Sequence, residues 1–247
     1  MVAVLGPLIW ANPGWSWIRI TAGVAAAAAI VADKLADKYD QLIASLKFRL
    51  SEKSAEKAID DLNVVLSEAI ELAFLSGDAR KQAALALRRT VARQAASAVG
   101  DGSRATYYTM RRETAGKRIL GSAVHGTEHG RYDKPDRPFV EREDPEHTIW
   151  NLMDRADEEP EISNAPDEVY GVDWSRKKYK TFYTVPVKAK SVQLGLLSVN
   201  NKSVGAIGGP QRAAVLAMAR TMALVIAMLK GPTAMKRQEA HHENVAG

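Results

Sequence analysis

The feature that most constrains the fold is a long run from Asp33 to Ser76 that contains neither proline nor glycine. Its apolar residues recur at the three- and four-residue steps of an α-helix. The last of them form an a/d seam of Ile59, Leu62, Leu66, Ala69 and Ala73. We therefore predict one long helix that ends near Gly77 and pairs with another helix, in the same chain or in a second copy.

An apolar segment precedes this run. Residues 15–32 carry Arg19 as their only charge, and a membrane span needs roughly 20 apolar residues. Trp15 and Trp17 lie at its start, and lysines and arginines gather after its end. Positive charge after a span places the following chain in the cytoplasm. The sequence thus predicts a single-pass cell-membrane protein, with a membrane segment within residues 1–33 and the lipid bilayer as a partner.

Two other interpretations of residues 15–32 are a buried helix and a cleaved signal peptide. A buried helix of a soluble domain stays open, because alanine dominates the middle of the run and contributes little to membrane insertion. A cleaved signal peptide is disfavoured, since it needs positive charge before the apolar run and residues 1–14 carry no Lys or Arg.

Composition excludes several kinds of chemistry. The 247-residue chain has no cysteine, which rules out disulfides, thiolate metal sites, thioether-linked chromophores and cysteine nucleophiles. Its formal net charge of +5 is modest, and no nucleic-acid partner is expected. No nucleophile-and-base set appears either, so we predict a protein that is not an enzyme.

The remaining elements follow from periodicity and turn residues. A second helix is expected over residues 79–99, and a short helix over 144–159 with Asp144 as its cap and Pro145 at its first position. Four strands are expected in "ATYYTMRRE", "KRILGSAVHG", "KTFYTVPVKAK" and "VQLGLLSVNNK". A helix that is apolar around most of its surface should cover 211–230, followed by a polar tail over 232–247.

This order of elements resembles the GAF domain, an α/β (α+β) sensory module. "TVPV" at 184–187 and "GLLSVNN" at 195–201, followed by the long apolar helix, carry the resemblance. It implies a GAF-like antiparallel sheet flanked by helices, with the first and last helices on one face and a ligand pocket on the other. We expect a membrane segment at 1–33, a linking helix at 34–53, the GAF-like domain at 54–231 and the tail at 232–247.

The resemblance also suggests a helical, coiled-coil-like homodimer or higher oligomer. The residues expected at its interface are Ile59, Leu62, Leu66, Ala69, Met222 and Ile226. In the cyclic-nucleotide branch of the family, a motif begins with Asn and Lys, as Asn201 and Lys202 do here. That motif continues with a Phe and then an Asp-Glu pair. This chain has Ile207 in place of the Phe and Gln211–Arg212 in place of the acidic pair, so ordinary cyclic nucleotides are not the expected ligands.

Candidate binding residues gather in "HGTEHGRYD" at 125–133. We expect these at the rim of a ligand cavity: His125, Glu128, His129, Arg131 and Tyr132. Arg131 suits an anionic ligand, and Trp174 suits stacking on a planar one. Metal ligation by the two histidines and the glutamate is not expected, because a glycine-punctuated polar stretch is typical of a solvated loop. The sequence identifies no cofactor.

The working hypothesis is a membrane-anchored, non-enzymatic GAF-like sensor of a small ligand, possibly of nucleotide type, or of a protein partner. It signals through the linking helix to the membrane segment or to a separate output protein. Two alternatives remain: a ligand-free scaffold that dimerises at the membrane, and a nucleotide-gated membrane effector of bacterial defence.

The membrane segment makes a direct prediction. Full-length protein should sediment with membranes and resist extraction by carbonate or high salt, because an inserted span is held by apolar contact with lipid. Cell fractionation with immunodetection measures this. Recovery of the full chain in the soluble fraction without detergent would show that residues 15–32 do not span.

Overall fold

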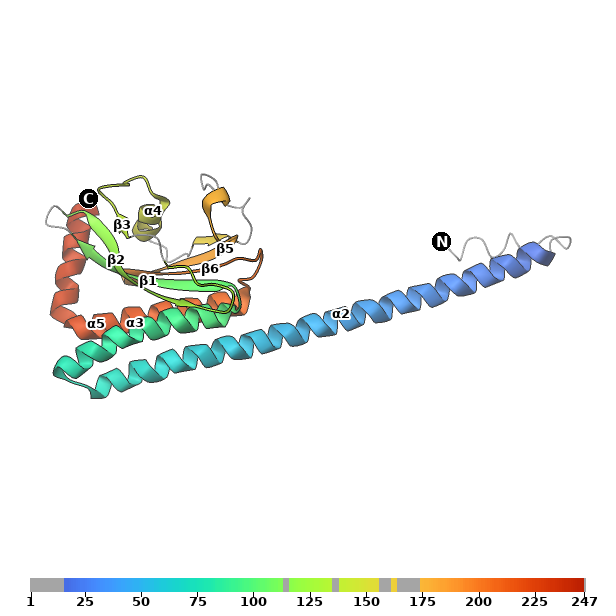
Figure 1. Cartoon of the computed structure of the whole chain (residues 1–247), viewed down its shortest axis with the longest axis horizontal. Helices are drawn as coiled ribbons and strands as arrows, with labels where there is room; N and C mark the ends of the chain where they lie inside the picture. The colour runs from blue at the N-terminus through green and yellow to red at the C-terminus, as the bar shows by residue number, and fades with distance from the viewer. Residues whose placement is uncertain (1–15, 113–115, 135–137, 156–160, 164–173, 247) are drawn as a thin grey trace. The chain divides into compact units, whose positions relative to one another are not determined.

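A computed structural model describes residues 16–112, 116–134, 138–155, 161–163 and 174–246 (Figure 1). The chain divides into two units, Met1–Lys53 and Ser54–Gly247. Helix α2, Ser16–Glu71, begins in the first unit and ends in the second, where the 3₁₀ turn η1, Leu72–Phe74, follows it. The predicted long helix is confirmed. The predicted membrane segment lies outside the described part of the chain, apart from its helical backbone from Ser16 onward.

The second unit is built on one six-stranded antiparallel sheet in the order β3-β2-β1-β6-β5-β4. Figure 1 shows α3 and α5 along one face of the sheet and α4 on the other. This arrangement confirms a GAF-like antiparallel sheet flanked by helices. The elements after η1 are α3 (Gly77–Val99), β1 (Ser103–Arg112), β2 (Arg118–Thr127), β3 (Phe139–Val140), α4 (Thr148–Asp154), β4 (Glu161–Ser163), η3 (Trp174–Arg176), β5 (Thr181–Ala189), β6 (Val192–Asn201) and α5 (Gly209–Ala246).

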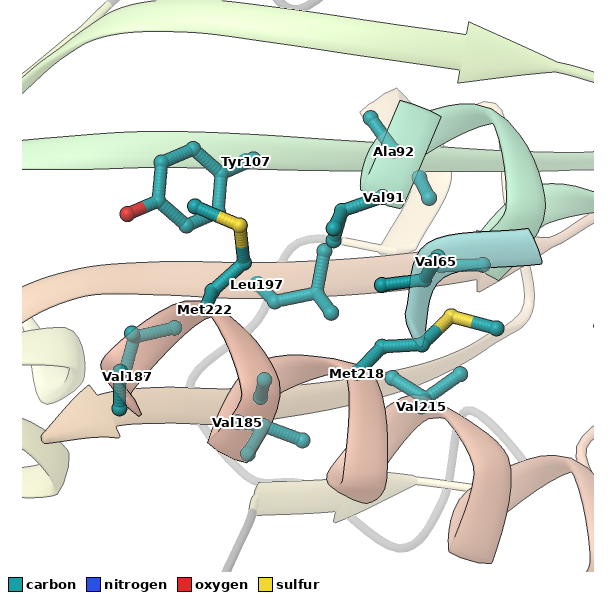
Figure 2. Close-up of a cluster of buried hydrophobic side chains, with 14 of the residues drawn as sticks. Val65, Val91, Ala92, Tyr107, Val185, Val187, Leu197, Val215, Met218 and Met222 are labelled. Atoms are coloured by element: carbon teal, nitrogen blue, oxygen red, sulfur yellow. The ribbon is translucent and has the colours of Figure 1, made fainter. Parts of the chain in front are cut away.

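The main core lies between the sheet and the helices α3 and α5. Alternate strand residues such as Tyr107 and Leu197 point into it and meet Val91 of α3 and Met218 of α5 (Figure 2). Gly126 of β2 lets α3 approach closely, since a Cβ atom there would lie 2.4 Å from the Cα atom of Arg93. A larger residue at 126 would push the helix off the sheet.

Helix α2 and the turn η1 join this core through a row of side chains at three- and four-residue steps. Ala58, Val65 and Leu72 are buried, and Leu62 and Ala69 between them pack partly against the core. Two polar contacts with α3 flank the row: Thr90 donates to Glu68 at 3.0 Å, and Asp61 is hydrogen-bonded to Ser97. Burial raises the pKa of Asp61 above its ordinary value, although the Ser97 contact opposes the shift.

The predicted dimer interface is only partly available. Ile59 is 57% exposed and Leu66 is 38% exposed, whereas Leu62 and Ala69 pack partly against the core. The inclusion of Met222 and Ile226 was wrong, because they are 1% and 8% exposed within this chain's own core. The apolar surface of α5 is needed to cover the sheet and α3.

The end of the chain also differs from the prediction. Residues 232–246 continue as helix after a break at Gly231, whose φ is 76° and ψ is 164°, instead of forming a polar tail without structure. Met235 packs against the core, and Lys190 Nζ lies 3.3 Å from Glu239 Oε1. Among the described residues, one helical stretch is long and apolar enough to cross a membrane, Gly209–Ala240, and half of its apolar window is buried inside this chain.

Helix α4 covers part of the opposite face of the sheet. It starts later than predicted: His147, not Asp144, is the cap, and its Nδ1 accepts from the Ile149 backbone N–H at 3.1 Å. The Asp144 backbone N–H is taken by a turn to the Val140 carbonyl, so the chain is not yet helical there. Trp150 is buried, and its Nε1 donates to the Asp144 carbonyl at 2.8 Å.

A buried arginine pins α4 to the sheet. Arg118, at the start of β2, pairs with Glu141 through Nη2 at 2.6 Å and also with Asp154 of α4. Its guanidinium lies 5.1 Å from the Trp150 ring, where a cation–π contact forms. Gln193 of β6 completes the cluster by donating to the Met153 carbonyl at 2.9 Å and to Asp154 at 3.0 Å.

This cluster predicts a pH-dependent loss of stability in Glu141→Gln. Burial raises the pKa of Glu141, but the hydrogen bonds and charge of Arg118 outweigh it, so the pKa lies below its ordinary value. A depressed pKa contributes stability above the unfolded-state pKa, and that stability disappears as pH falls through the folded-state pKa. At pH 7 the variant should lose about 1.5–3 kcal/mol of unfolding free energy.

Urea denaturation at pH 7 and at about pH 3.5, which is below the unfolded-state pKa of roughly 4.3, measures the effect. The difference from wild type should shrink at the lower pH. Glu143→Gln, at an exposed position two residues on, is the matched control and should change little. An equal loss in both variants would contradict the role of Arg118.

Candidate functional site

The strand register separates two faces of the sheet. Ala105 and Tyr107 of β1 lie in the core with the helices, so Arg104, Thr106 and Tyr108 lie on the opposite face, called here the outer face. Paired residues across neighbouring strands share a face. Asn200 is paired with Arg104, and Ser198 with Thr106.

The outer face has two chemically different halves. The apolar half consists of Tyr108, Leu120 and Leu196, and α4 covers it with Ile149, Trp150, Leu152 and Met153. The polar half consists of Arg104, Thr106, Thr184, Ser198 and Asn200, on the three central strands β1, β6 and β5. Of the two halves, only the second presents a row of polar side chains.

Several buried atoms of the polar half have no hydrogen-bond partner among the residues that the structure describes. They are Thr106 Oγ1, Asn200 Oδ1 and Arg104 Nε, joined by Arg131 Nη1 from the segment after β2. Thr184 and Ser198, in contrast, satisfy each other at 2.8 Å. Buried polar groups in folded proteins are almost always paired, so unpaired ones on one surface indicate where a ligand or water binds.

Arg131 is held firmly in place. It is only 1% exposed, and its guanidinium binds the Asp133 carboxylate and lies 6.0 Å from the Tyr179 ring. Arg104 binds the same carboxylate at 2.6 Å and the Lys134 carbonyl at 2.7 Å. Burial raises the pKa of Asp133, but Arg131 and Arg104 lower it more, so the carboxylate is ionised at neutral pH.

Of the predicted site residues, Arg131 and Trp174 come together. Tyr179 contacts both: its ring lies 6.0 Å from the Trp174 ring and faces the Arg131 guanidinium. Trp174 is also stacked on Phe182 of β5, with ring centroids 6.2 Å apart. Its indole therefore anchors the segment before β5 to the sheet, in addition to any contact with a ligand.

The other predicted residues do not converge with these two. His125 lies on the outer face beside Thr106 but is exposed, and Tyr132 is 82% exposed. His129 is exposed, and its carbonyl accepts from the Gly102 backbone N–H at 2.7 Å. The charge of Glu128 acts on Asp61 of α2. The position of His129, Tyr132 and Glu128 at a cavity rim stays a prediction, and hydrogen bonds tie the segment that carries them to the ends of β1 and β6.

Asn201 and Lys202 also have a structural role. Asn201 donates to the Asp101 carbonyl at 2.8 Å and accepts from the Ser203 backbone N–H at 2.7 Å. Lys202 Nζ donates to the Gly130 carbonyl at 2.6 Å. Both side chains hold neighbouring loops together.

Within the described residues, no three His, Asp or Glu side chains gather in a way that suits a metal ion.

Sequence reasoning missed Arg104, Thr106 and Asn200. A signal was present in "SRATYYT" at 103–109, where Arg and Thr alternate with Ala and Tyr in one strand. Polar residues at every second position of a buried strand mark a polar face that some other group must cover.

No protein-family model and no curated protein matches this chain. Among solved structures, it is similar to the phycoerythrobilin-bound GAF domain from a cyanobacterial phytochrome, with a TM-score of 0.51 and 11% identity over 70% of this chain and 95% of that one. The phycocyanobilin-bound GAF domain from a cyanobacterial phytochrome gives a TM-score of 0.50 and 12% identity over 70% and 95%. At such identities the likeness shows the fold alone: the matched part, 70% of this chain, has a GAF-like fold.

Proposed function

We propose that this GAF-like unit is a sensor module that binds a small ligand on the polar half of the outer face and passes its state through α2. The observation that carries the proposal is the set of unpartnered buried atoms there: Thr106 Oγ1, Asn200 Oδ1, Arg104 Nε and Arg131 Nη1. A buried donor or acceptor left unpaired costs about 1–3 kcal/mol. A ligand that supplies partners recovers that free energy on binding.

The proposed route of the signal is α2. This helix packs against the core along one side and extends into the first unit of the chain. A change in how the sheet and α3 pack therefore reaches α2 directly. Anchoring of α2 in the cell membrane is part of the proposal and is supported by the apolar run at 15–32 and the basic residues that follow it. A binding role, not a catalytic one, is proposed because the chain has no cysteine and no nucleophile-and-base set in its sequence.

A second candidate function is the ligand-free scaffold. The observation that favours it is the apolar half of the outer face, which α4 fills with Trp150 and Met153. Filling of this kind leaves less of the face for a ligand. The scaffold hypothesis does not explain the unpartnered atoms of the polar half, and we therefore place it second.

Thr106→Val distinguishes the two functions. Removing an unpaired buried hydroxyl is close to neutral or stabilising in a protein without ligand, whereas it removes a contact if a ligand is bound. We expect native mass spectrometry of gently purified wild type to show a retained small molecule. The variant should retain less of it and should melt no lower than wild type once the molecule is removed.

Thr109→Val is the matched control. Its hydroxyl lies on the helix side of the same strand and accepts from Arg88 at 3.2 Å. This variant should lose stability and keep the molecule. Wild type with no retained molecule, together with a stabilised Thr106→Val, would support the scaffold instead.

Self-association is a separate part of the proposal, and Leu66→Lys tests it. Leu66 and Ile59 form an exposed apolar stripe on α2, and neither is needed for the core. The lysine should therefore leave the thermal melt nearly unchanged and convert a dimer to a monomer, because a second copy would have to bury an unpaired ammonium. Light scattering in detergent at tens of micromolar measures the mass.

Val65→Lys is the comparison for that experiment, since Val65 is fully buried in the core and its change should unfold the unit. A wild-type protein that is already monomeric would remove the dimer from the proposal.

A further inference from the structure

The polar half contains more buried positive charge than negative. Arg104 is 7% exposed and Arg131 is 1% exposed, and both bind Asp133. Asp133 Oδ2 accepts from Arg104 Nη1 at 2.6 Å and from Arg131 Nη2 at 3.2 Å, so the two guanidinium groups share one carboxylate oxygen. Within the described residues, two cations and one anion leave one positive charge without a buried counter-charge.

The surroundings add to this excess. Lys202 lies close by, since its Nζ donates to the carbonyl of Gly130, the residue before Arg131. The carboxylate of Glu128, in the same segment, acts on Asp61 of α2. Tyr179 covers one side of the Arg131 guanidinium. The arginine is therefore fixed by its partners and is not turned out to solvent.

The unpaired atoms specify the kind of ligand. Arg104 Nε and Arg131 Nη1 are donors on charged groups, and such donors favour carboxylate or phosphate oxygens. Asn200 is paired with Arg104 across the two central strands, and its unpaired Oδ1 is an acceptor. Thr106 is the next residue of β1 after Arg104 that lies on the outer face, and its unpaired Oγ1 can donate or accept a hydrogen bond.

We propose that the ligand of this module is a small molecule with an oxyanion group, phosphate or carboxylate, next to a hydrogen-bond donor. Its acidic group binds Arg104 and Arg131, and its donor binds Asn200 Oδ1. This inference rests on the proposed ligand-binding function and goes beyond it by naming the chemical class and a second arginine. Asp133 neutralises part of the site, so it competes with the ligand for the same two guanidinium groups.

Asp133→Asn gives the sharpest test. Losing a contact usually weakens ligand binding, whereas this substitution should strengthen phosphate binding. The full chain in detergent is melted in increasing inorganic phosphate at constant ionic strength, with chloride as the exchanged anion. Wild type should gain melting temperature in a saturable way. The variant should melt lower without phosphate, should be restored by phosphate, and should bind it about tenfold more tightly, the change expected when one charged hydrogen-bond competitor is removed.

Arginine variants supply the second arm. Arg131→Gln should weaken phosphate binding about 10- to 100-fold, the usual effect of losing a hydrogen bond to a charged group. Arg131→Lys keeps the charge but not the planar guanidinium group. Its affinity for phosphate should lie between that of wild type and that of Arg131→Gln. Arg93→Gln, at an exposed position on α3, is the matched control and should bind as wild type does.

The outcomes separate this inference from the function beneath it. If phosphate stabilises no better than chloride and Asp133→Asn is not restored, the anion site is wrong. If, in addition, native mass spectrometry finds a neutral molecule that survives Arg131→Gln, ligand binding stands without an anion. If neither method finds a ligand, the proposed function falls as well.

Discussion

The arrangement of the second unit depends on the close contact of α3 with β2. At Gly126 the helix backbone comes so near the strand that a Cβ atom would lie 2.4 Å from the Arg93 Cα atom. Once α3 occupies that face, the two-residue period of β1 assigns every side chain to one side or the other. Tyr107 goes to the core, and Arg104 and Thr106 go to the outer face. The polar half is thus a consequence of where the helices pack.

The outer face in turn depends on Arg118. Because this arginine binds both Glu141 and Asp154, α4 is held over Tyr108 and Leu196 and does not reach the row of Arg104 and Asn200. The apolar half is closed by packing, and the polar half is left with donors and acceptors that the sheet itself does not satisfy. One face therefore carries both a structural surface and a candidate binding surface.

The sequence predicted the elements well where the signal is local. Alternating residues marked β1 and β2, and the order of strands and helices led to the GAF-like arrangement that the structure confirms. Local signals failed at the start of α4, where Asp144 has the usual capping chemistry but its N–H is taken by a turn to Val140. They failed again for Met222, since an apolar position does not say which partner covers it.

The site was predicted less completely, and the reason is distance along the chain. Arg131 was singled out, but its relation to Arg104, 27 positions earlier by number, arises only when Asp133 folds between them. Asn200 was not singled out, because its position as an unpaired acceptor beside Arg104 requires the register of β1 with β6. Such groupings come from strand pairing and are not visible in spacing.

The way α2 is attached has a mechanical consequence. Ala58, Val65 and Leu72 are buried, and Leu62 and Ala69 pack partly beside them, so the attachment is a narrow stripe along one side of the helical segment, with the Asp61 and Glu68 contacts next to it. Sliding along the axis would require every side chain in the stripe to leave its place together, whereas a small rotation about the axis moves each side chain only a short way. Rotation about the long axis of α2 is therefore the displacement that this attachment opposes least.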